Sequence, residues 1–349
     1  MLAIIKQFLV KSHEVTLPVI RKEKLLQWLA SHFGQPVTAA LICGDASFRR
    51  YYRVKCGHLS FIVMDTPVAL IATEPFVEVA AAYAMADIPV PEIIAVEPQQ
   101  GFILLQDLGD ISLLSRLDND TVEPWYHAAL ALLPQVAKVR ATTQGALPQY
   151  DAEFVMRELA IFSEWLLQHH LGMRLTEPQQ TMLAAAFSVL CDSALAQPQV
   201  GMHRDFHSRN LMVHDEKLYV IDFQDAVVGP MTYDAVSLIR DCYIRWPDAV
   251  VERLQVAHFD LCRQQGLLAD NHDLAEYIQW FDLMGIQRHL KAAGIFARLY
   301  HRDQKPGYLK DIPLTLSYIV DVAARYPALQ PLAAFVGEIQ PLVAAKDGQ

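Results

Sequence analysis

The sequence predicts an α+β fold in which a small β-rich part precedes a larger, mostly helical part. Short β-like runs separated by glycines occupy the chain before residue 107, and apolar residues at helical spacing dominate after Gly109. The 349 residues are 53% hydrophobic and 19% charged, which is enough apolar material for a large core. We therefore expect two domains, residues 1–107 with a β-rich lobe and residues 108–349 with a helical lobe.

The N-terminal part is expected to be a five-stranded antiparallel sheet with two helices. Apolar residues at helical spacing predict a first helix at residues 19–33, which ends at Gly34. A second helix, at residues 74–86, follows the third strand and is stopped by Pro89 and Pro91. The strands are expected at residues 37–42, 51–56, 59–64, 93–96 and 101–106.

The C-terminal part is expected to consist of helices interrupted by one loop and two short strands. The clearest helix start is at Thr176, which is a good N-cap and is followed by Pro178 just inside the helix. The expected helices cover residues 122–140, 153–169, 176–196, 233–243, 249–265, 274–300, 309–325 and 331–345.

The interrupting loop contains the most informative run of the chain. It reads His-Arg-Asp at residues 203–205, then Asn210, then an apolar strand that ends in Asp222 and a phenylalanine. This pattern is typical of enzymes that transfer a phosphoryl group from ATP to a hydroxyl. Such a transfer needs a carboxylate to orient the hydroxyl and accept its proton, which we assign to Asp205. It also needs hard oxygen ligands for Mg²⁺, which we assign to Asn210 and Asp222.

Two other interpretations of this run stay open. Asp205 and Asn210 could be cap residues in a turn between two helices. A metallohydrolase site is the second possibility, with four candidate ligands in His203, Asp205, His207 and Asp222. The second interpretation gives Asn210 no role, and the sequence has no further histidine-rich motif to support it.

Nucleotide-binding residues are expected in the N-terminal part. The loop after the first strand contains Gly44, Ala46 and Ser47, small residues that let backbone N–H groups approach phosphate. An ordinary hairpin turn is the alternative for this loop. The junction near Gln106 and Leu108 is apolar and then polar, so its backbone groups are expected to bind adenine.

The third strand lacks the lysine that such enzymes usually place near its end to pair with the phosphates. Met64 stands in the corresponding run. The nearest cations are three arginines, so we expect at least one of Arg49, Arg50 and Arg53 to contact phosphate. The alternative is that they are solvated strand charges.

Composition restricts the partners and the compartment. A net charge of −10 argues against nucleic acid and anionic membranes, because both bind basic surfaces. The five cysteines are scattered without a C-x-x-C pair, which favours a reduced cytoplasmic protein without a disulfide framework or zinc site. The apolar start of the chain is interrupted by Lys6 and lacks a cleavage site, so an extra helix or strand is expected there instead of a signal peptide. No apolar run is judged long enough to span a membrane.

These motifs resemble the aminoglycoside phosphotransferase and choline kinase superfamily, a branch of the protein-kinase-like bilobal fold. The histidine two residues after Asp205, His207, is a feature in which this sequence resembles that branch. A closer likeness is to the bacterial cell-wall-recycling kinases that phosphorylate the anomeric C1 hydroxyl of N-acetylmuramate and N-acetylglucosamine. It extends from about residue 20 to about residue 325, and its motifs lie at residues 44–51, 221–230, 233–241 and 285–299.

The resemblance implies an ATP- and Mg²⁺-dependent sugar kinase with Asp205 as the base and Asn210 and Asp222 as metal ligands. It also implies that Met64 is compatible with activity, since that family also lacks the strand lysine. The acceptor pocket would lie in the helical part, and its candidate residues are His207, Asp225, Arg240, Arg288 and His289.

Some of these positions have structural alternatives. Arg288, His289 and Lys291 are also what a solvated helix face would carry. Tyr233 and Asp234 are expected to cap the following helix, not to touch substrate.

Two other functions also stay open, a kinase for another small alcohol, such as an aminoglycoside or choline, and a non-catalytic binding module with the same fold. From Met231 onward there are 14 Asp and Glu against 12 Lys and Arg, which favours a neutral or anionic sugar over a polycationic acceptor.

Overall fold

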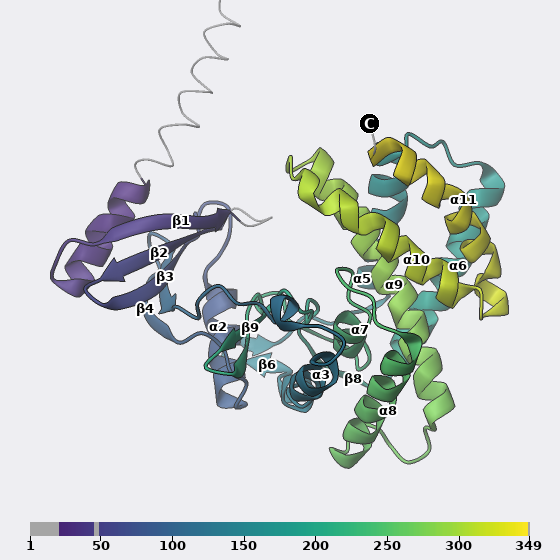
Figure 1. The fold of residues 1–349 in the computed structure, drawn as a ribbon, viewed down its shortest axis with the longest axis horizontal. Helices are drawn as coiled ribbons and strands as arrows, with labels where there is room; N and C mark the ends of the chain where they lie inside the picture. Colours follow the sequence, from purple (N-terminus) through teal and green to yellow (C-terminus); the bar gives the residue numbers. More distant parts are fainter. Residues whose placement is uncertain (1–20, 45–48, 348–349) are drawn as a thin grey trace, which may run out of the picture. The chain divides into compact units, whose positions relative to one another are not determined.

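The computed structural model describes residues 21–44 and 49–347 of the chain (Figure 1). The chain divides into two compact units, each of which combines separate stretches of sequence. The first unit is the chain up to Val77 together with Pro91–Gly109, and the second is Glu78–Val90 together with Asp110–Gln349.

The first unit contains the predicted five-stranded antiparallel sheet, in the order β1-β2-β3-β5-β4. Met64 pairs with Tyr51 on one side and with Ile103 on the other, so the third strand is internal. Each strand begins and ends close to the predicted positions, and the bounds are β1 Thr38–Gly44, β2 Arg50–Cys56, β3 Leu59–Asp65, β4 Ile93–Glu97 and β5 Phe102–Gln106.

The helix at residues 21–33 packs on one face of this sheet (Figure 1). Leu25 and Leu29, one turn apart, are fully buried in a cluster with Tyr52 and Val54 of β2. Alternation along the strand directs those two side chains to the same face. Each fully buried aliphatic or aromatic side chain contributes about 1.5–3 kcal/mol, and this burial holds the predicted first helix in place.

Helix α2 (Glu74–Met85) begins in the first unit and continues in the second. The ring of Tyr83, near its end, lies 5.7 Å from the ring of Phe223 and 6.3 Å from that of His203, measured between centroids. Helical spacing predicts the helix, but it does not say which core the apolar face joins. The predicted domain boundary after residue 107 therefore does not account for the passage of α2 from the first unit into the second.

The second unit is mostly helical, as predicted. Helix α6 starts as expected, because Thr176 Oγ1 accepts from Gln179 N while the Gln179 side chain accepts from Thr176 N. The α-helices are α3 Val122–Leu130, α4 Leu133–Lys138, α5 Ala152–Ile161, α6 Glu177–Ala196, α7 Tyr233–Ile239, α8 Asp248–Gln264, α9 Leu274–His301, α10 Ile312–Ala323 and α11 Gln330–Asp347. Short 3₁₀ segments are η1 Leu113–Arg116, η3 Pro306–Asp311 and η4 Pro327–Leu329.

Two predicted helices differ from the expectation. The helix expected at 122–140 is divided into α3 and α4, because Pro134 lacks a donor and fits only the first turn of a new helix. The helix expected at 153–169 changes from α5 to the π-helical segment η2 (Phe162–His170). Gly294 of α9 lies against this junction, where an added Cβ would be 2.5 Å from Ile161 O.

Helix α9, of 28 residues, is the central element of the second unit. Helices α5, α7, α8, α10 and segment η2 all contact it, and α10 also contacts α11 (Figure 1). Most of its middle, from Trp280 to Leu290, is buried. Charged side chains in this stretch therefore need partners inside the protein.

Helix α11 corrects one expectation. Residues Pro327–Lys346 are long and apolar enough to span a membrane by length and composition. Leu332, Val336, Ile339 and Val343 of this segment are nevertheless buried, at a spacing that forms one helix face. We interpret α11 as a helix packed on the second unit.

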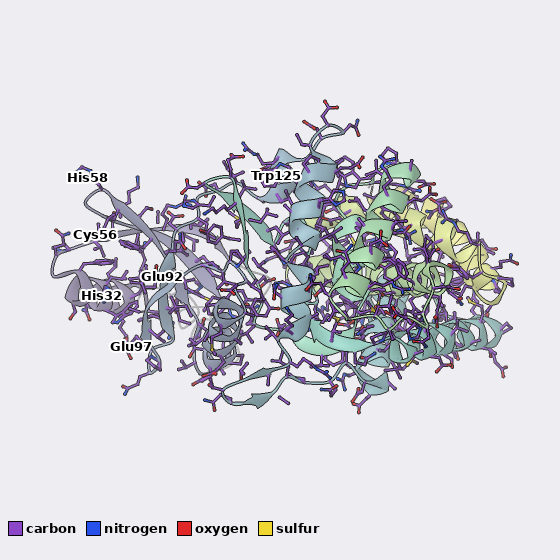
Figure 2. All side chains as sticks on the ribbon, turned by 90° about the horizontal axis from the view of Figure 1, so that it is seen from below. His32, Cys56, His58, Glu92, Glu97 and Trp125 are labelled. Atoms are coloured by element: carbon purple, nitrogen blue, oxygen red, sulfur yellow. The ribbon has the colours of Figure 1, made fainter. Side chains whose placement is uncertain are left out.

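Four of the five cysteines, namely Cys56, Cys191, Cys242 and Cys262, are free thiols. Cys191, Cys242 and Cys262 are buried. Cys56, at the end of β2, is half-buried and lies near His58 of the β2–β3 turn (Figure 2).

Candidate active site

Two antiparallel ribbons bring the predicted site residues together. Strand β8 (Gln199–Met202) pairs with β11 (Val227–Pro230), and β9 (Leu211–His214) pairs with β10 (Lys217–Val220). The chain passes from β8 to β9 through residues 203–210 and from β10 to β11 through residues 221–226. Both loops connect the same two ribbons, so they run side by side. The pairing of β8 with β11 was not predicted.

The three residues assigned from the motif meet at these loops. The Asn210 amide nitrogen donates to Asp205 O at 3.0 Å and to Asp222 Oδ2 at 3.3 Å. Gln224 Nε2 donates to the other Asp222 oxygen at 2.9 Å. Asp205 and Asn210 lie between two strands instead of at helix ends, so the helix-cap interpretation is wrong.

The His203 side chain is fully buried and hydrogen-bonds within the loop pair. Its Nε2 donates to Ile221 O at 3.0 Å, and its Nδ1 accepts from Asp205 N at 3.2 Å. The carbonyl can only accept, which places the proton on Nε2. Burial is the main cause of the lowered pKa of His203. Both ring nitrogens are occupied, so the metallohydrolase interpretation loses one of its four ligands.

Asp234 of α7 fixes the backbone just before Asp205. Its carboxylate accepts from His203 N at 2.7 Å and from Arg204 N at 2.9 Å. Arg204 has φ 78°, a left-handed conformation that is costly for any residue with a Cβ. The predicted capping role is wrong, because the N-cap of α7 is Thr232 and Asp234 instead stabilises this conformation.

Asp241, just after α7, fixes the middle of the same loop. It accepts hydrogen bonds from Ser208 N at 3.0 Å and from Ser208 Oγ. Its other oxygen accepts from Tyr243 N at 3.2 Å. Asp234 and Asp241 thus hold the loop from the two ends of one short helix.

Glu158 of α5 forms the centre of a buried charge network. Its Oε1 accepts from Arg204 Nη2 at 2.8 Å and from Lys291 Nζ at 2.9 Å. Its Oε2 accepts from Tyr150 OH at 2.6 Å and from Gln287 Nε2 at 3.3 Å. Burial opposes ionisation of Glu158, but the two cations outweigh it and lower its pKa to about 2.

The Asp205 carboxyl lies in a strongly positive environment. Burial would raise its pKa, but Lys291, His207, Arg204 and Arg288 together hold that pKa well below the usual range. Asp205 is therefore ionised at neutral pH, which is the state that can accept a proton.

His207 and Arg288 lie close enough to Asp205 to affect its charge. Burial is the main cause that lowers the pKa of His207 to about 4, so the imidazole is neutral at pH 7. Its Nδ1 is buried and has no hydrogen-bond partner among the described residues. Arg288 is 5% exposed, and its Nη1 donates to Cys242 Sγ at 3.3 Å.

The remaining acceptor-pocket candidates have other contacts. Arg240 forms a 2.7 Å ion pair with Asp282, and both are buried. His289 hydrogen-bonds to Arg240 O at 2.9 Å and stacks on Tyr318 with centroids 4.6 Å apart. The Asp225 side chain is exposed, and its carbonyl accepts from Arg204 Nη1 at 3.2 Å.

The α9 side chains are not a solvated face. Arg288, His289 and Lys291 are all buried, which contradicts that alternative. Lys291 also donates to Tyr233 OH at 2.9 Å.

The first unit places the predicted nucleotide-binding residues as follows. Arg53 forms a bidentate pair with Asp107, through Nε at 2.7 Å and Nη2 at 3.0 Å. Gln106 N donates to Glu92 O at 2.9 Å, and Leu108 is 6% exposed. Three other positions are at the β1–β2 connection: Gly44 ends β1, Arg49 is buried just before β2, and Arg50 begins β2 opposite Gly44. Ala46 and Ser47 lie outside the described residues.

The donor set at the loops fits a magnesium ion. Both hydrogen bonds of the Asn210 amide within the described residues use its nitrogen, so its oxygen remains available beside the Asp222 carboxylate. Among the described residues, no group of three or more His, Cys, Asp and Glu could form an all-protein metal cage. Mg²⁺ is commonly held by one or two protein oxygen ligands together with substrate phosphates, and this pair matches that requirement.

Residues 38–269 match the family model described as the phosphotransferase enzyme family, which is more than half of the chain. The chain belongs to the phosphotransferase enzyme family. Membership in an enzyme family argues against the alternative of a non-catalytic binding module.

Curated relatives of this phosphotransferase carry one name. It is 38% identical to the N-acetylmuramate/N-acetylglucosamine kinase of Neisseria meningitidis, over 91% of this chain and 96% of the relative. It is 39% identical to the protein of that name from Pseudomonas putida, over 85% of this chain and 86% of the relative.

Solved structures similar to this phosphotransferase have the predicted protein-kinase-like fold. An ethanolamine kinase of Plasmodium vivax has a TM-score of 0.60 at 10% identity, covering 86% of this chain and 84% of its own. A choline kinase of Streptococcus pneumoniae has a TM-score of 0.58 at 12% identity, covering 86% and 99%. An ADP-bound aminoglycoside phosphotransferase has a TM-score of 0.56 at 12% identity, covering 86% and 98%.

Three carboxylates that support the loops, namely Glu158, Asp234 and Asp241, were not assigned this role from the sequence. Each is an acid in a mostly apolar stretch. A carboxylate in such a stretch is a signal that it will be buried with partners.

Proposed function

We propose that this phosphotransferase moves the γ-phosphoryl group of ATP to the anomeric hydroxyl of N-acetylmuramate and N-acetylglucosamine, with Mg²⁺ and in the cytoplasm. The choice of acceptor rests on the named relatives at 38% and 39% identity over most of both chains. The choice of chemistry rests on the meeting of Asp205, Asn210 and Asp222 at the paired loops.

Asp205 acts as the base in this proposal. Its carboxylate orients the sugar hydroxyl and accepts its proton as the hydroxyl oxygen forms a bond to the γ-phosphorus. The bond from that phosphorus to the oxygen bridging to the β-phosphate breaks, and ADP leaves with the bonding electrons. Asn210 and Asp222 would hold Mg²⁺, which neutralises charge on the phosphates when bound.

The acceptor pocket is proposed around the neighbours of Asp205. His207 is neutral and has a buried ring nitrogen without a partner among the described residues, so it can hydrogen-bond a sugar oxygen or N–H. Arg288 supplies a cation, and the contacts of Arg240 and His289 support a role in holding that part of α9. Asp225 has an exposed carboxylate that can accept from a sugar hydroxyl.

The nucleotide is proposed to bind through the first unit. The linker backbone around Gln106 and Leu108 would contact adenine. The phosphates would contact the β1–β2 loop and nearby cations, through Gly44, Ala46, Ser47, Arg49 and Arg53.

Substituting Asp205 tests the assignment of the base. We expect Asp205→Asn to lower kcat by about 10²–10⁴-fold, because the proton acceptor is lost while shape is kept. ADP release with both sugars measures this. Asp215→Asn, in the exposed β9–β10 turn, is the matched control and should keep activity. Wild-type turnover in Asp205→Asn, with unchanged circular dichroism, would refute the assignment.

An acceptor panel tests the substrate. The wild-type protein is assayed with both N-acetylated sugars, an aminoglycoside and choline. Phosphorylation at C1 of either sugar, detected by NMR, supports the proposal. Turnover with the aminoglycoside or choline but with neither sugar contradicts the acceptor and leaves the phosphoryl-transfer chemistry intact.

A further inference from the structure

Arg288 differs from the other cations of this region in its partners. Arg204 and Lys291 both pair with Glu158, at 2.8 and 2.9 Å. Arg240 pairs with Asp282. Within the described part of the chain, Arg288 forms no ion pair with a carboxylate.

The hydrogen bonding of Arg288 is also incomplete. Its Nη1 donates only to the Cys242 thiol, a weak acceptor, and its buried Nε has no partner among the described residues. Burial opposes its charge, but the acidic groups around it, Cys242, Tyr233, Asp241 and Asp205, raise its pKa, and it is charged at neutral pH. A buried guanidinium without a paired anion is unfavourable, so this position is suited to an incoming anionic group.

A second unsatisfied group points to the same place. The buried Nδ1 of His207 has no partner among the described residues. Arg288 and Asp205 both act on the pKa of His207, which places the three side chains within electrostatic reach of one another. A neutral donor or acceptor and an unpaired cation beside the base form a site for a ligand that is both polar and anionic.

We propose that the Arg288 guanidinium binds the carboxylate of N-acetylmuramate and thereby favours this acceptor over N-acetylglucosamine. The inference rests on the proposed function and deepens it. The two sugars differ by one lactyl ether, whose carboxylate only N-acetylmuramate carries. A guanidinium matches a carboxylate with two parallel hydrogen bonds, which a thiol partner does not provide. The other anion near the base is the transferring phosphoryl group, which both acceptors share.

The wild-type protein tests this without any substitution. Its kcat/KM is measured with N-acetylmuramate, with the neutral carboxamide of N-acetylmuramate, and with N-acetylglucosamine. We expect about a tenfold to hundredfold loss from carboxylate to carboxamide, the size of a charged hydrogen bond. Equal values for the acid and the carboxamide would overturn the inference. No turnover with any of the three sugars would instead contradict the proposed acceptors and this inference together.

Variants then assign the effect to Arg288. Arg288→Gln should lower kcat/KM for N-acetylmuramate at least tenfold more than for N-acetylglucosamine, and Arg288→Lys should restore part of the preference. Arg253→Gln is the control, because Arg253 lies on the exposed side of α8 in a surface pair with Glu123. An equal loss with both sugars contradicts the inference and indicates a contact with the phosphoryl group or a structural role. If Arg288→Gln does not fold, the carboxamide comparison decides.

Discussion

At the scale of single residues, the charge balance near the site depends on Glu158. One buried carboxylate partners both Arg204, next to the base, and Lys291 of the central helix. Removing one partner of a buried pair leaves an uncompensated charge, which lowers stability much more than the loss of a surface pair does. Here two cations would lose their partner at once.

We therefore expect Glu158→Gln to lower the free energy of unfolding by about 3–5 kcal/mol. Urea denaturation followed by circular dichroism measures this. Glu153→Gln is the matched control on the same helix, because Glu153 is 80% exposed in its pair with Arg157. The control should change stability by less than about 1 kcal/mol. Equal effects of the two substitutions would contradict the role of Glu158.

The same residue predicts a pH dependence. The pKa of Glu158 is about 2 in the folded protein against an ordinary 4.5. A depressed pKa contributes stability that is fully present above about pH 4.5 and is lost as the pH falls toward 2. The stability difference between wild type and Glu158→Gln should therefore shrink over this window. A difference that stays constant from pH 6 to pH 3 would argue against this linkage.

Sequence spacing was sufficient to group the residues that are proposed to act on substrate, but it was insufficient to find the residues that support them. Asp205, Asn210 and Asp222 belong to one local pattern, and the structure brings them together. Asp234, Asp241 and Glu158 act from elements distant in sequence, and only the tertiary fold determines their partners.

At the scale of the elements, helix α9 and the α5–η2 junction pack against each other with almost no space between their backbones. The backbone of Ile161 and Phe162 approaches Gly294 so closely that a Cβ would lie 2.5 Å from Ile161 O and 2.7 Å from Phe162 N. Neither neighbour is a flexible side-chain end, so relief requires a shift of a helix. Helix starts such as Thr176 have a local signature, whereas the change to π-helix at Phe162, which lies against this distant glycine, was not predicted.

Gly294→Ala should consequently destabilise the protein by about 1–3 kcal/mol through overpacking. Gly337→Ala is a control within helix α11, where an added Cβ meets nothing within 4 Å. The control should be neutral or stabilising by about 0.4–1 kcal/mol, since alanine favours a helix. Thermal midpoints of the two variants measure the contrast. A stabilising Gly294→Ala would show that the two segments separate easily.

At the scale of the whole molecule, the chain passes between the two units at three points, and the last of these follows a linker whose end is fixed within the first unit. Asp107 accepts from Arg53, from Ser60 Oγ and from Gly109 N at 3.0 Å. Burial opposes its ionisation, but these partners lower its pKa. The sequence predicted a junction here from composition. The partner of Arg53 could not be predicted, because it depends on the register of three strands.

Asp107→Ala should raise KM for ATP by about tenfold or less, because the linker backbone expected to bind adenine loses its anchors. The kcat value and the KM for sugar should change little. Lys55→Ala, exposed on the same strand as Arg53, is the control. An unchanged KM for ATP in Asp107→Ala, together with a raised one in Arg53→Ala, would mean that Arg53 acts on phosphate and not through the linker.

The placement of the acceptor candidates on α9 bears on how this scaffold could be altered. The loop that is proposed to perform the chemistry is fixed by acids in and just after α7, whereas Arg288 and His289 belong to another, much longer helix. The proposed determinant of selectivity, Arg288, and the proposed base thus occupy separate segments of sequence. Directed evolution confined to a few codons of α9 could broaden or redirect the range of sugars accepted, while the loops proposed to carry out the phosphoryl transfer keep their sequence.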